Sequence, residues 1–156
     1  MTSYLALKTL HFLSASILFG TGIGIAFFML RAYLSGNAEV LATTVKSVVL
    51  ADWIFTVPAV VVQLVTGLWL TRHLGISHGS SWYVWAMSLF AFAGLCWLPL
   101  VGIEIKIRFA INNGANIARV APLMRIWLAL GVLLFTSIAA LYVLMVWKYG
   151  VTKLSP

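Results

Sequence analysis

The 156-residue chain has very few cysteines and acids. Aspartate and glutamate together number 3, and Cys96 is the one thiol. A single thiol cannot form an internal disulfide, and it cannot supply all the ligands of a thiolate metal site. No Cys-x-x-Cys-His sequence occurs, which excludes covalent attachment of a c-type haem. We therefore interpret Cys96 as a small packing residue.

Charged residues of any kind make up 8% of the chain, whereas hydrophobic residues make up 63% and the mean hydropathy is +1.07. A chain of this composition cannot fold as a soluble globule without leaving large apolar surfaces in water. It is therefore expected to be an integral membrane protein. Its N-terminal apolar stretch is about twice as long as a signal-peptide core and follows no basic cluster, so we expect a retained helix there.

Four apolar stretches are long enough to cross a bilayer as helices, which takes about 20 residues each. These stretches cover residues 4–34, 53–74, 82–111 and 123–147. Asn37 can cap a further helix over residues 38–52, which is expected to lie at the membrane interface and to lead into the second span. The short connections make neighbouring spans antiparallel. The predicted fold is an all-α integral membrane four-helix bundle, a single membrane domain over residues 1–156.

The basic residues predict the orientation, because cytoplasmic connections carry an excess of Lys and Arg. Of the 10 basic residues, 6 belong to the first and third connections: Arg31, Lys46, Lys106, Arg108, Arg119 and Arg125. The remaining 4 lie on the other side: Lys8, Arg72, Lys148 and Lys153. Both termini are thus expected on the non-cytoplasmic side of a bacterial inner (plasma) membrane. The net charge of +7 then reflects anionic lipid headgroups, not nucleic-acid binding.

His11 lies inside the first span, about 10 Å into the membrane if the helix starts near Tyr4. An imidazole in hydrocarbon costs free energy unless it has a partner, so such a residue is by default a candidate functional residue. Lys8, Ser14 and Gly22 share its side of the helix. A structural hydrogen bond to a neighbouring helix is the alternative to a ligand or proton-relay role.

The other two histidines, His73 and His78, fall on the same side of the membrane as His11. Two imidazoles facing each other across a four-helix bundle would ligate a b-type haem, and nearby cations would neutralise its propionates. We expect His11 as one axial ligand of the haem iron and His73 as the second, with His78 as the other candidate. Lys8 and Arg72 are the predicted propionate partners. A solvated surface role is the alternative for each outer histidine.

Two other groups of residues have mainly structural interpretations. Ser16, Gly20 and Gly24 lie on the opposite side of the first span from His11, as a small-residue surface for close helix packing. Asp52 and Glu104 are the acids near the inner side of the spans. We interpret them as partners of the surrounding basic residues, with a proton-entry carboxylate as the alternative.

The chain resembles a superfamily of small haem-binding membrane proteins, which includes HemJ-type protoporphyrinogen oxidases and CopD-type copper-resistance proteins. The likeness rests on Lys8-x-Leu10-His11 followed by Gly20 and Gly22, and on Pro58 followed by Gly67-Leu68-Trp69-Leu70. Within the superfamily, the chain is most similar to a bacterial family of predicted integral membrane proteins of unknown function. That likeness extends over nearly the whole chain and includes Arg125-x-Trp127 and Met145-x-x-Lys148.

This resemblance implies a four-helix bundle in which His11 ligates haem b. HemJ proteins also carry a functional lysine within a Trp-Leu-His-x-Lys run at the start of the third span. The corresponding run here is Trp82-Tyr83-Val84-Trp85-Ala86, which has no lysine. The difference argues against protoporphyrinogen oxidation but not against haem binding.

The leading hypothesis is a haem b protein in electron transfer or redox chemistry with a quinol-like or porphyrin-like partner, or with a redox partner protein. The first alternative is a non-catalytic accessory or assembly subunit, which would join a larger membrane complex or a homo-oligomer through the Gly20/Gly24 surface. A copper-handling membrane protein is the second alternative. It has less support, because no Met-rich or His-rich run occurs near the outer face.

Overall fold

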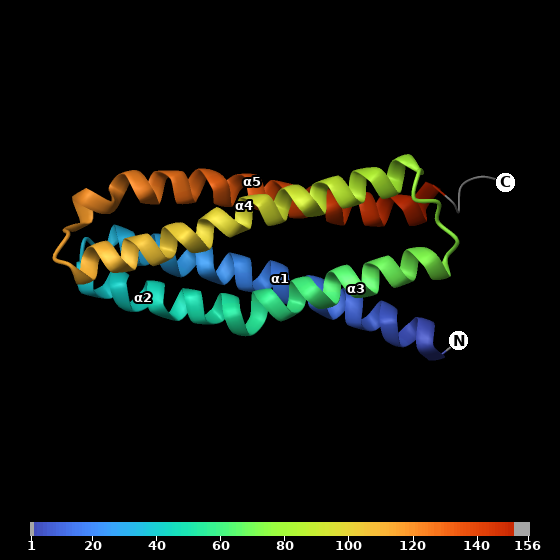
Figure 1. Ribbon diagram of the computed structural model, residues 1–156, viewed down its shortest axis with the longest axis horizontal. Coiled ribbons are helices and arrows are strands. Elements are labelled where there is room, and N and C mark those ends of the chain that lie inside the picture. Colours follow the sequence, from blue (N-terminus) through green and yellow to red (C-terminus); the bar gives the residue numbers. More distant parts are fainter. Residues whose placement is uncertain (1, 152–156) are drawn as a thin grey trace.

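The computed structural model describes the backbone of residues 2–151 and the side chains of residues 3–147. The side chains of Lys148 and Lys153 therefore lie outside the described residues. Within the described part, the chain is helical apart from short connections (Figure 1). The elements are α1 (Thr2–Leu34), α2 (Ala38–Ala51), η1 (Asp52–Thr56), α3 (Val57–His73), α4 (Ser81–Asn112) and α5 (Ile117–Val151).

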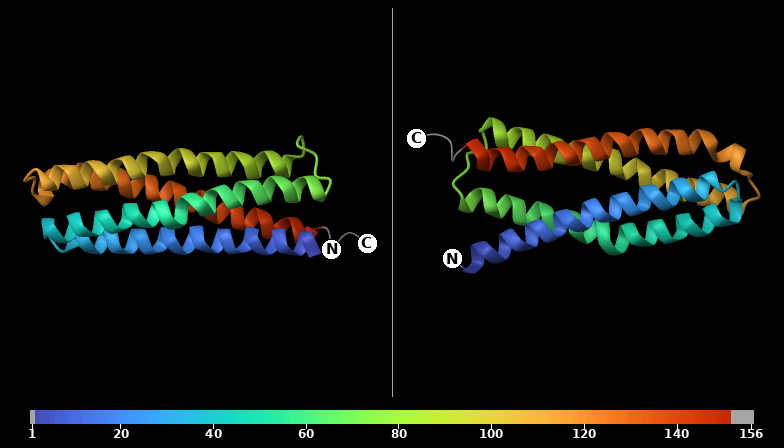
Figure 2. Two further views of the ribbon diagram at one scale, coloured as in Figure 1. Left: turned by 60° about the horizontal axis from the view of Figure 1, so that its bottom comes forward. Right: turned by 180° about the vertical axis from the view of Figure 1, so that it is seen from behind.

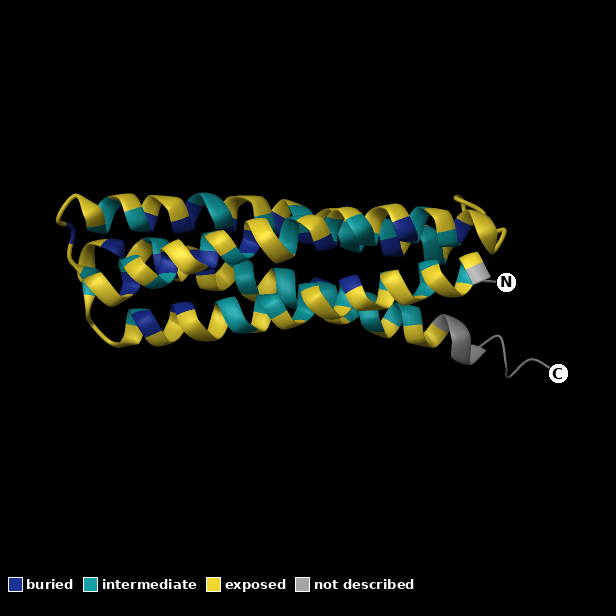
Figure 3. Cartoon of the chain, turned by 90° about the horizontal axis from the view of Figure 1, so that it is seen from below, coloured by how far each residue is buried: buried dark blue, intermediate teal, exposed yellow. Residues whose placement is uncertain are grey.

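These elements form four continuous helical rods, because α2, η1 and α3 make up one of them. All four rods are long and apolar enough to cross a membrane. They cover Ser3–Leu34, Ala38–His73, Ser81–Asn112 and Ile117–Trp147. The predicted all-α membrane bundle of four spans is thereby confirmed. Large apolar side chains such as Phe28, Leu95 and Phe109 remain exposed, as expected for helices surrounded by lipid. Figure 3 shows exposed residues along the length of every helix.

The second rod contains a π-helical turn. α2, η1 and α3 follow one another without a break, and η1 ends at Thr56, two residues before Pro58. Proline has no N–H, so the normal helical bond to the carbonyl of Ile54 cannot form. The Val57 N–H instead bonds back to the Asp52 carbonyl, five residues earlier. Such turns are rare and are frequently found at functional sites.

The segment over residues 38–52 differs from its prediction as an interfacial helix. In the structure it is α2, which runs in line with α3 and packs against α1 and α4. Its apolar side chains Leu41, Val45 and Val48 are buried in the main core of the bundle. The segment is drawn into the bundle because two neighbouring helices offer its apolar face more contact than a flat interface would.

The three connections divide the bundle into two ends. Residues 74–80, the start of α1 and the end of α5 lie at one end, which we call the terminal end (Figure 1). Residues 35–37 and 113–116 form the opposite end. Each connection contains a glycine with positive φ, a backbone conformation that other residues rarely adopt: Gly36, Gly75 and Gly114.

The helices pack mainly as two antiparallel pairs, α1 with α3 and α4 with α5. α2 joins the pairs by packing against both α1 and α4, and Figure 2 shows this arrangement from two further sides. The ring of Phe19 on α1 also contacts the rings of Phe135 and Tyr142 on α5. The main core lies toward the opposite end, where Met29, Leu41 and Ile107 are fully buried.

We expect the opposite end to face the cytoplasm, because 6 of the 10 basic residues lie within residues 31–46 and 106–125, which contain its two connections and the adjoining helix ends. In right-side-out membrane vesicles of a Cys96→Ala background, Ser77→Cys should react with a membrane-impermeant maleimide. Asn113→Cys should react only after the membrane is permeabilised. The reverse labelling pattern would place the terminal end in the cytoplasm.

Candidate functional site: a polar network around His11

The contact between α1 and α3 encloses a strip of polar side chains inside an otherwise apolar bundle. His11 and Ser14 come from α1, whereas Gln63 and Thr66 come from α3. Each pair is separated by three residues, which puts its members on one helical face. Ser14 and Thr66 are buried, and His11 and Gln63 are half-buried.

Both ring nitrogens of His11 are hydrogen-bonded to α3. Nδ1 lies 2.9 Å from Thr66 Oγ1, and Nε2 lies 3.0 Å from Gln63 Nε2. The Thr66 hydroxyl donates its own hydrogen to the carbonyl oxygen of Val62 at 2.5 Å, so toward His11 it accepts. An amide nitrogen can only donate, so Gln63 donates to His11 Nε2. The network therefore assigns the imidazole proton to Nδ1 and the lone pair to Nε2.

Ser14 determines which way the Gln63 amide faces. The Ser14 hydroxyl donates to Gln63 Oε1 at 2.6 Å and also lies 3.0 Å from the backbone carbonyl oxygen of His11. With Oε1 turned to Ser14, the amide nitrogen of Gln63 is turned to His11. The hydrogen bonds thus run from Ser14 through Gln63 to His11, then through Thr66 to the backbone of α3.

Gly67 allows the imidazole to lie against α3. A Cβ atom at Gly67 would be 3.2 Å from His11 Cε1, which is closer than an ordinary carbon contact. Gly22, the other glycine assigned to the site from the sequence, is elsewhere. A Cβ atom there would be 3.7 Å from the Phe135 ring of α5, so Gly22 contributes to the contact between α1 and α5.

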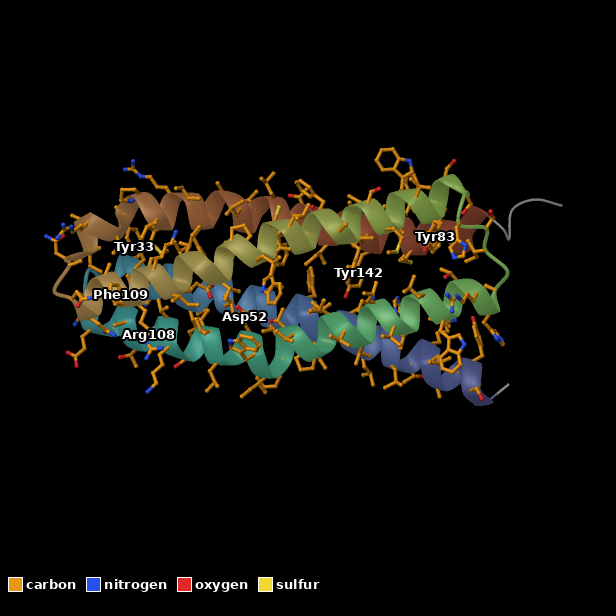
Figure 4. All side chains as sticks on the ribbon, in the orientation of Figure 1. Tyr33, Asp52, Tyr83, Arg108, Phe109 and Tyr142 are labelled. Carbon is orange, nitrogen blue, oxygen red and sulfur yellow. The ribbon has the colours of Figure 1, made fainter. Side chains whose placement is uncertain are left out.

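The outer histidines have other neighbours. His73 follows Thr66 by seven residues, about 10 Å along α3, and its ring stacks on Tyr4 with centroids 5.5 Å apart. His78, in the connection after α3, packs edge-on against Tyr83, which Figure 4 labels near the terminal end. The three histidines lie in the same half of the bundle, but His73 and His78 each pack against a tyrosine whereas His11 bonds to α3.

The predicted propionate partners also lie toward the terminal end. Lys8 is one turn before His11, and its Nζ atom is 6.0 Å from the centre of the Tyr4 ring. The Arg72 side chain is exposed at the end of α3. Among the described residues, no group of three or more His, Cys, Asp and Glu side chains is arranged to hold a metal ion.

The arrangement around His11 suits a ligand role for its Nε2 atom. Metal-ligating histidines almost always donate their other ring N–H to a protein group, which sets the tautomer and the ring orientation. Thr66 provides that acceptor for Nδ1–H. The Nε2 lone pair accepts from Gln63, so a metal at Nε2 would require the Gln63 amide to turn away.

The sequence analysis placed Ser14 beside His11 but did not single out Gln63 or Thr66. Gln63 carried a usable signal, because a lone amide within an apolar span needs a partner for the same reason as an imidazole. Thr66 carried a weaker one, because a threonine hydroxyl can be satisfied by the backbone of its own helix. Its contact with His11 follows from the register between α1 and α3.

Together, the four spans and the buried polar network define a polytopic helical membrane protein. The chain belongs to a family described as predicted integral membrane protein (DUF2269), whose family model matches residues 5–149. This match covers all four spans apart from residues 3 and 4, and it confirms the expected membership of a predicted integral membrane protein family. No curated protein and no solved structure matches the chain.

The network generates a stability prediction. Thr66→Val keeps the side-chain shape but leaves the buried Nδ1–H of His11 without an acceptor, which should cost about 1–3 kcal/mol. Thermal unfolding of the purified protein in detergent measures the change. Thr136→Val is the matched control, because the exposed Thr136 hydroxyl bonds to the Val132 carbonyl of its own helix. Equal unfolding temperatures for the two variants would contradict the hydrogen-bond assignment.

Proposed function

We propose that the protein binds haem b through His11 and acts in electron transfer or redox chemistry with a quinol-like or porphyrin-like partner. The observation that carries the proposal is the Thr66–His11 hydrogen bond, which places the proton on Nδ1 and so makes Nε2, the acceptor from Gln63, the nitrogen that would ligate a metal. A bound haem would supply one-electron redox chemistry. A bacterial inner membrane is the proposed location.

The residues around His11 have separate roles in this proposal. Thr66 holds the ring in one orientation and raises the basicity of Nε2 by accepting Nδ1–H. Gln63 keeps the lone pair satisfied while no cofactor is present, which matters because an unsatisfied polar atom in an apolar interior is costly. Lys8 and Arg72 lie on the terminal side of His11, where their cationic groups would meet propionates.

The proposal includes a distant relation to the HemJ-type and CopD-type haem-binding superfamily. Its support is the pattern of Lys8, His11, Pro58 and Gly67, of which His11 and Gly67 lie against each other in the structure. The absence of a lysine from residues 82–86 favours electron transfer over protoporphyrinogen oxidation.

A second candidate function is that of an accessory or assembly subunit, and the small-residue surface of α1 favours it. A Cβ atom at Gly20 or at Gly24 would meet no other atom within 4 Å, and Ser16 is exposed. The sequence predicted a surface for close helix packing. In the structure, however, these residues do not pack against other helices of this chain. They leave a smooth strip on which a helix of another membrane subunit can pack closely.

The haem proposal is tested by absorption spectroscopy of the protein purified after expression with ample haem supply. The wild type should show reduced-minus-oxidised α and Soret bands. His11→Ala should lose them with the four spans still inserted, because insertion depends on whole segments of about 20 residues. A colourless wild-type preparation would instead favour the accessory-subunit candidate.

The same spectra identify the second axial ligand. Loss of the bands in His73→Ala, but not in His78→Ala, would assign the second ligand to His73 as expected from the sequence. Full haem content and an unchanged spectrum in both single variants and in the double variant would exclude both outer histidines. In the first of these outcomes, His78→Ala also controls for the general effect of removing a histidine near the terminal end.

The accessory-subunit candidate is tested by native gel electrophoresis of detergent extracts from the native membrane. Combined Gly20→Leu and Gly24→Leu substitutions should convert a complex into the free chain, because leucine side chains prevent close helix contact. Gly94→Leu is the matched control, since a Cβ atom at Gly94 also meets nothing within 4 Å. Unchanged mobility of the double variant would contradict docking through this surface.

A further inference from the structure

A second buried polar cluster lies in the bundle, toward the opposite end from His73 and His78, and it contains two acids. Asp52 opens the π turn η1, and Glu104 lies in α4. Their side chains are buried, with exposed fractions of 4% and 1%. Figure 4 shows Asp52 near the middle of the bundle. The chain's third acid, Glu39, is exposed in the first turn of α2.

The buried carboxyl groups are bonded to indoles and not to the basic residues that the sequence analysis expected. Trp97 Nε1 donates to Asp52 Oδ1 at 3.2 Å, and Trp127 Nε1 donates to Glu104 Oε1 at 2.9 Å. Trp97 and Glu104 are seven residues apart on α4 and therefore share a face. An indole N–H stabilises a carboxyl oxygen, but it carries no charge that could neutralise a carboxylate.

The second oxygen of Glu104 has no hydrogen-bond partner. Glu104 Oε2 is buried and unpaired among the described residues. Asp52, the other buried acid, also accepts from an indole and supplies no positive charge. Among the described residues, the other charged side chains on α4, α2 and α5 are exposed or half-exposed: Glu39 and Lys46 on α2, Lys106 and Arg108 on α4, and Arg119 and Arg125 on α5. An ionised Glu104 would therefore lie in an apolar interior without a cationic partner among the described residues.

The unpaired oxygen is a site at which a cation would bind. The surrounding residues indicate whether that cation is a metal ion or a proton. Hard metal ions take about six to eight oxygen ligands, and the indoles around this cluster present hydrogens instead. The described residues also contain no metal-holding group of three His, Cys, Asp or Glu side chains. A proton needs a single oxygen, which Glu104 Oε2 provides.

We propose that Glu104 forms an exchangeable proton-binding site inside the bundle, in which its Oε2 atom carries the proton. Exchange breaks the O–H bond at Oε2 and forms one at a water molecule, with no oxidation or reduction. Glu104 lies eight residues before the end of α4, about 12 Å from the opposite end. The site is independent of His11 and of haem.

Infrared spectroscopy of the purified full-length protein in lipid nanodiscs tests this proposal. At neutral pH the wild type should show the C=O stretching band of a protonated carboxyl group, and the band should move to lower frequency in D2O. Glu104→Gln should lose this band and retain the shape of the side chain. Glu39→Gln is the matched control and should leave the band unchanged, because Glu39 is exposed.

Two further variants keep the test decisive if Glu104→Gln does not fold. Trp127→Phe removes the hydrogen bond to Oε1 and should move the band to higher frequency, whereas Asp52→Asn removes the other buried acid and should leave the Glu104 band in place. A missing band at neutral pH, a band that persists in Glu104→Gln, or a band insensitive to Trp127→Phe would overturn the assignment to Glu104. A band without an isotope shift would show a trapped proton and overturn exchange.

Discussion

The structure depends on the need of every polar group inside the bundle to find a partner within the protein, since lipid offers none. The His11 network meets this need fully at the imidazole. Each ring nitrogen has one partner on α3, and the hydrogen bonds end on the backbone carbonyl of Val62. The Glu104 cluster meets it partly, because one carboxyl oxygen is bonded to Trp127 and the other has no partner. The fully hydrogen-bonded imidazole and the partly hydrogen-bonded carboxyl group therefore indicate different chemistry.

A satisfied histidine and an unsatisfied acid respond differently to a ligand. A metal at His11 Nε2 would replace an existing bond from Gln63, so the affinity of the site would depend on how easily that amide turns away. A proton on Glu104 Oε2 replaces nothing. The proposed haem site therefore exchanges one interaction for another, while the proposed proton site removes an uncompensated charge.

The two proposed sites lie at different positions along the length of the bundle. The four candidate spans contain 31 to 36 residues, whereas a bilayer core needs about 20. Part of the bundle must therefore extend beyond the hydrocarbon or tilt within it. The main core and most of the basic residues lie toward the opposite end, and the histidines lie in the terminal half. A redox site and a proton site would thus occupy different levels of one bundle.

The sequence by itself determined the class of fold, because runs of about 20 apolar residues leave a chain no stable alternative to membrane helices. It also identified His11, since an imidazole in such a run is conspicuous. The tertiary structure decided the partners: Gln63 and Thr66 for His11, Tyr4 for His73, and tryptophans instead of basic residues for the two buried acids. Periodicity gives the face of a helix on which a residue lies. The register between two helices depends on the packing of all their side chains, and it is this register that selects the atoms that meet.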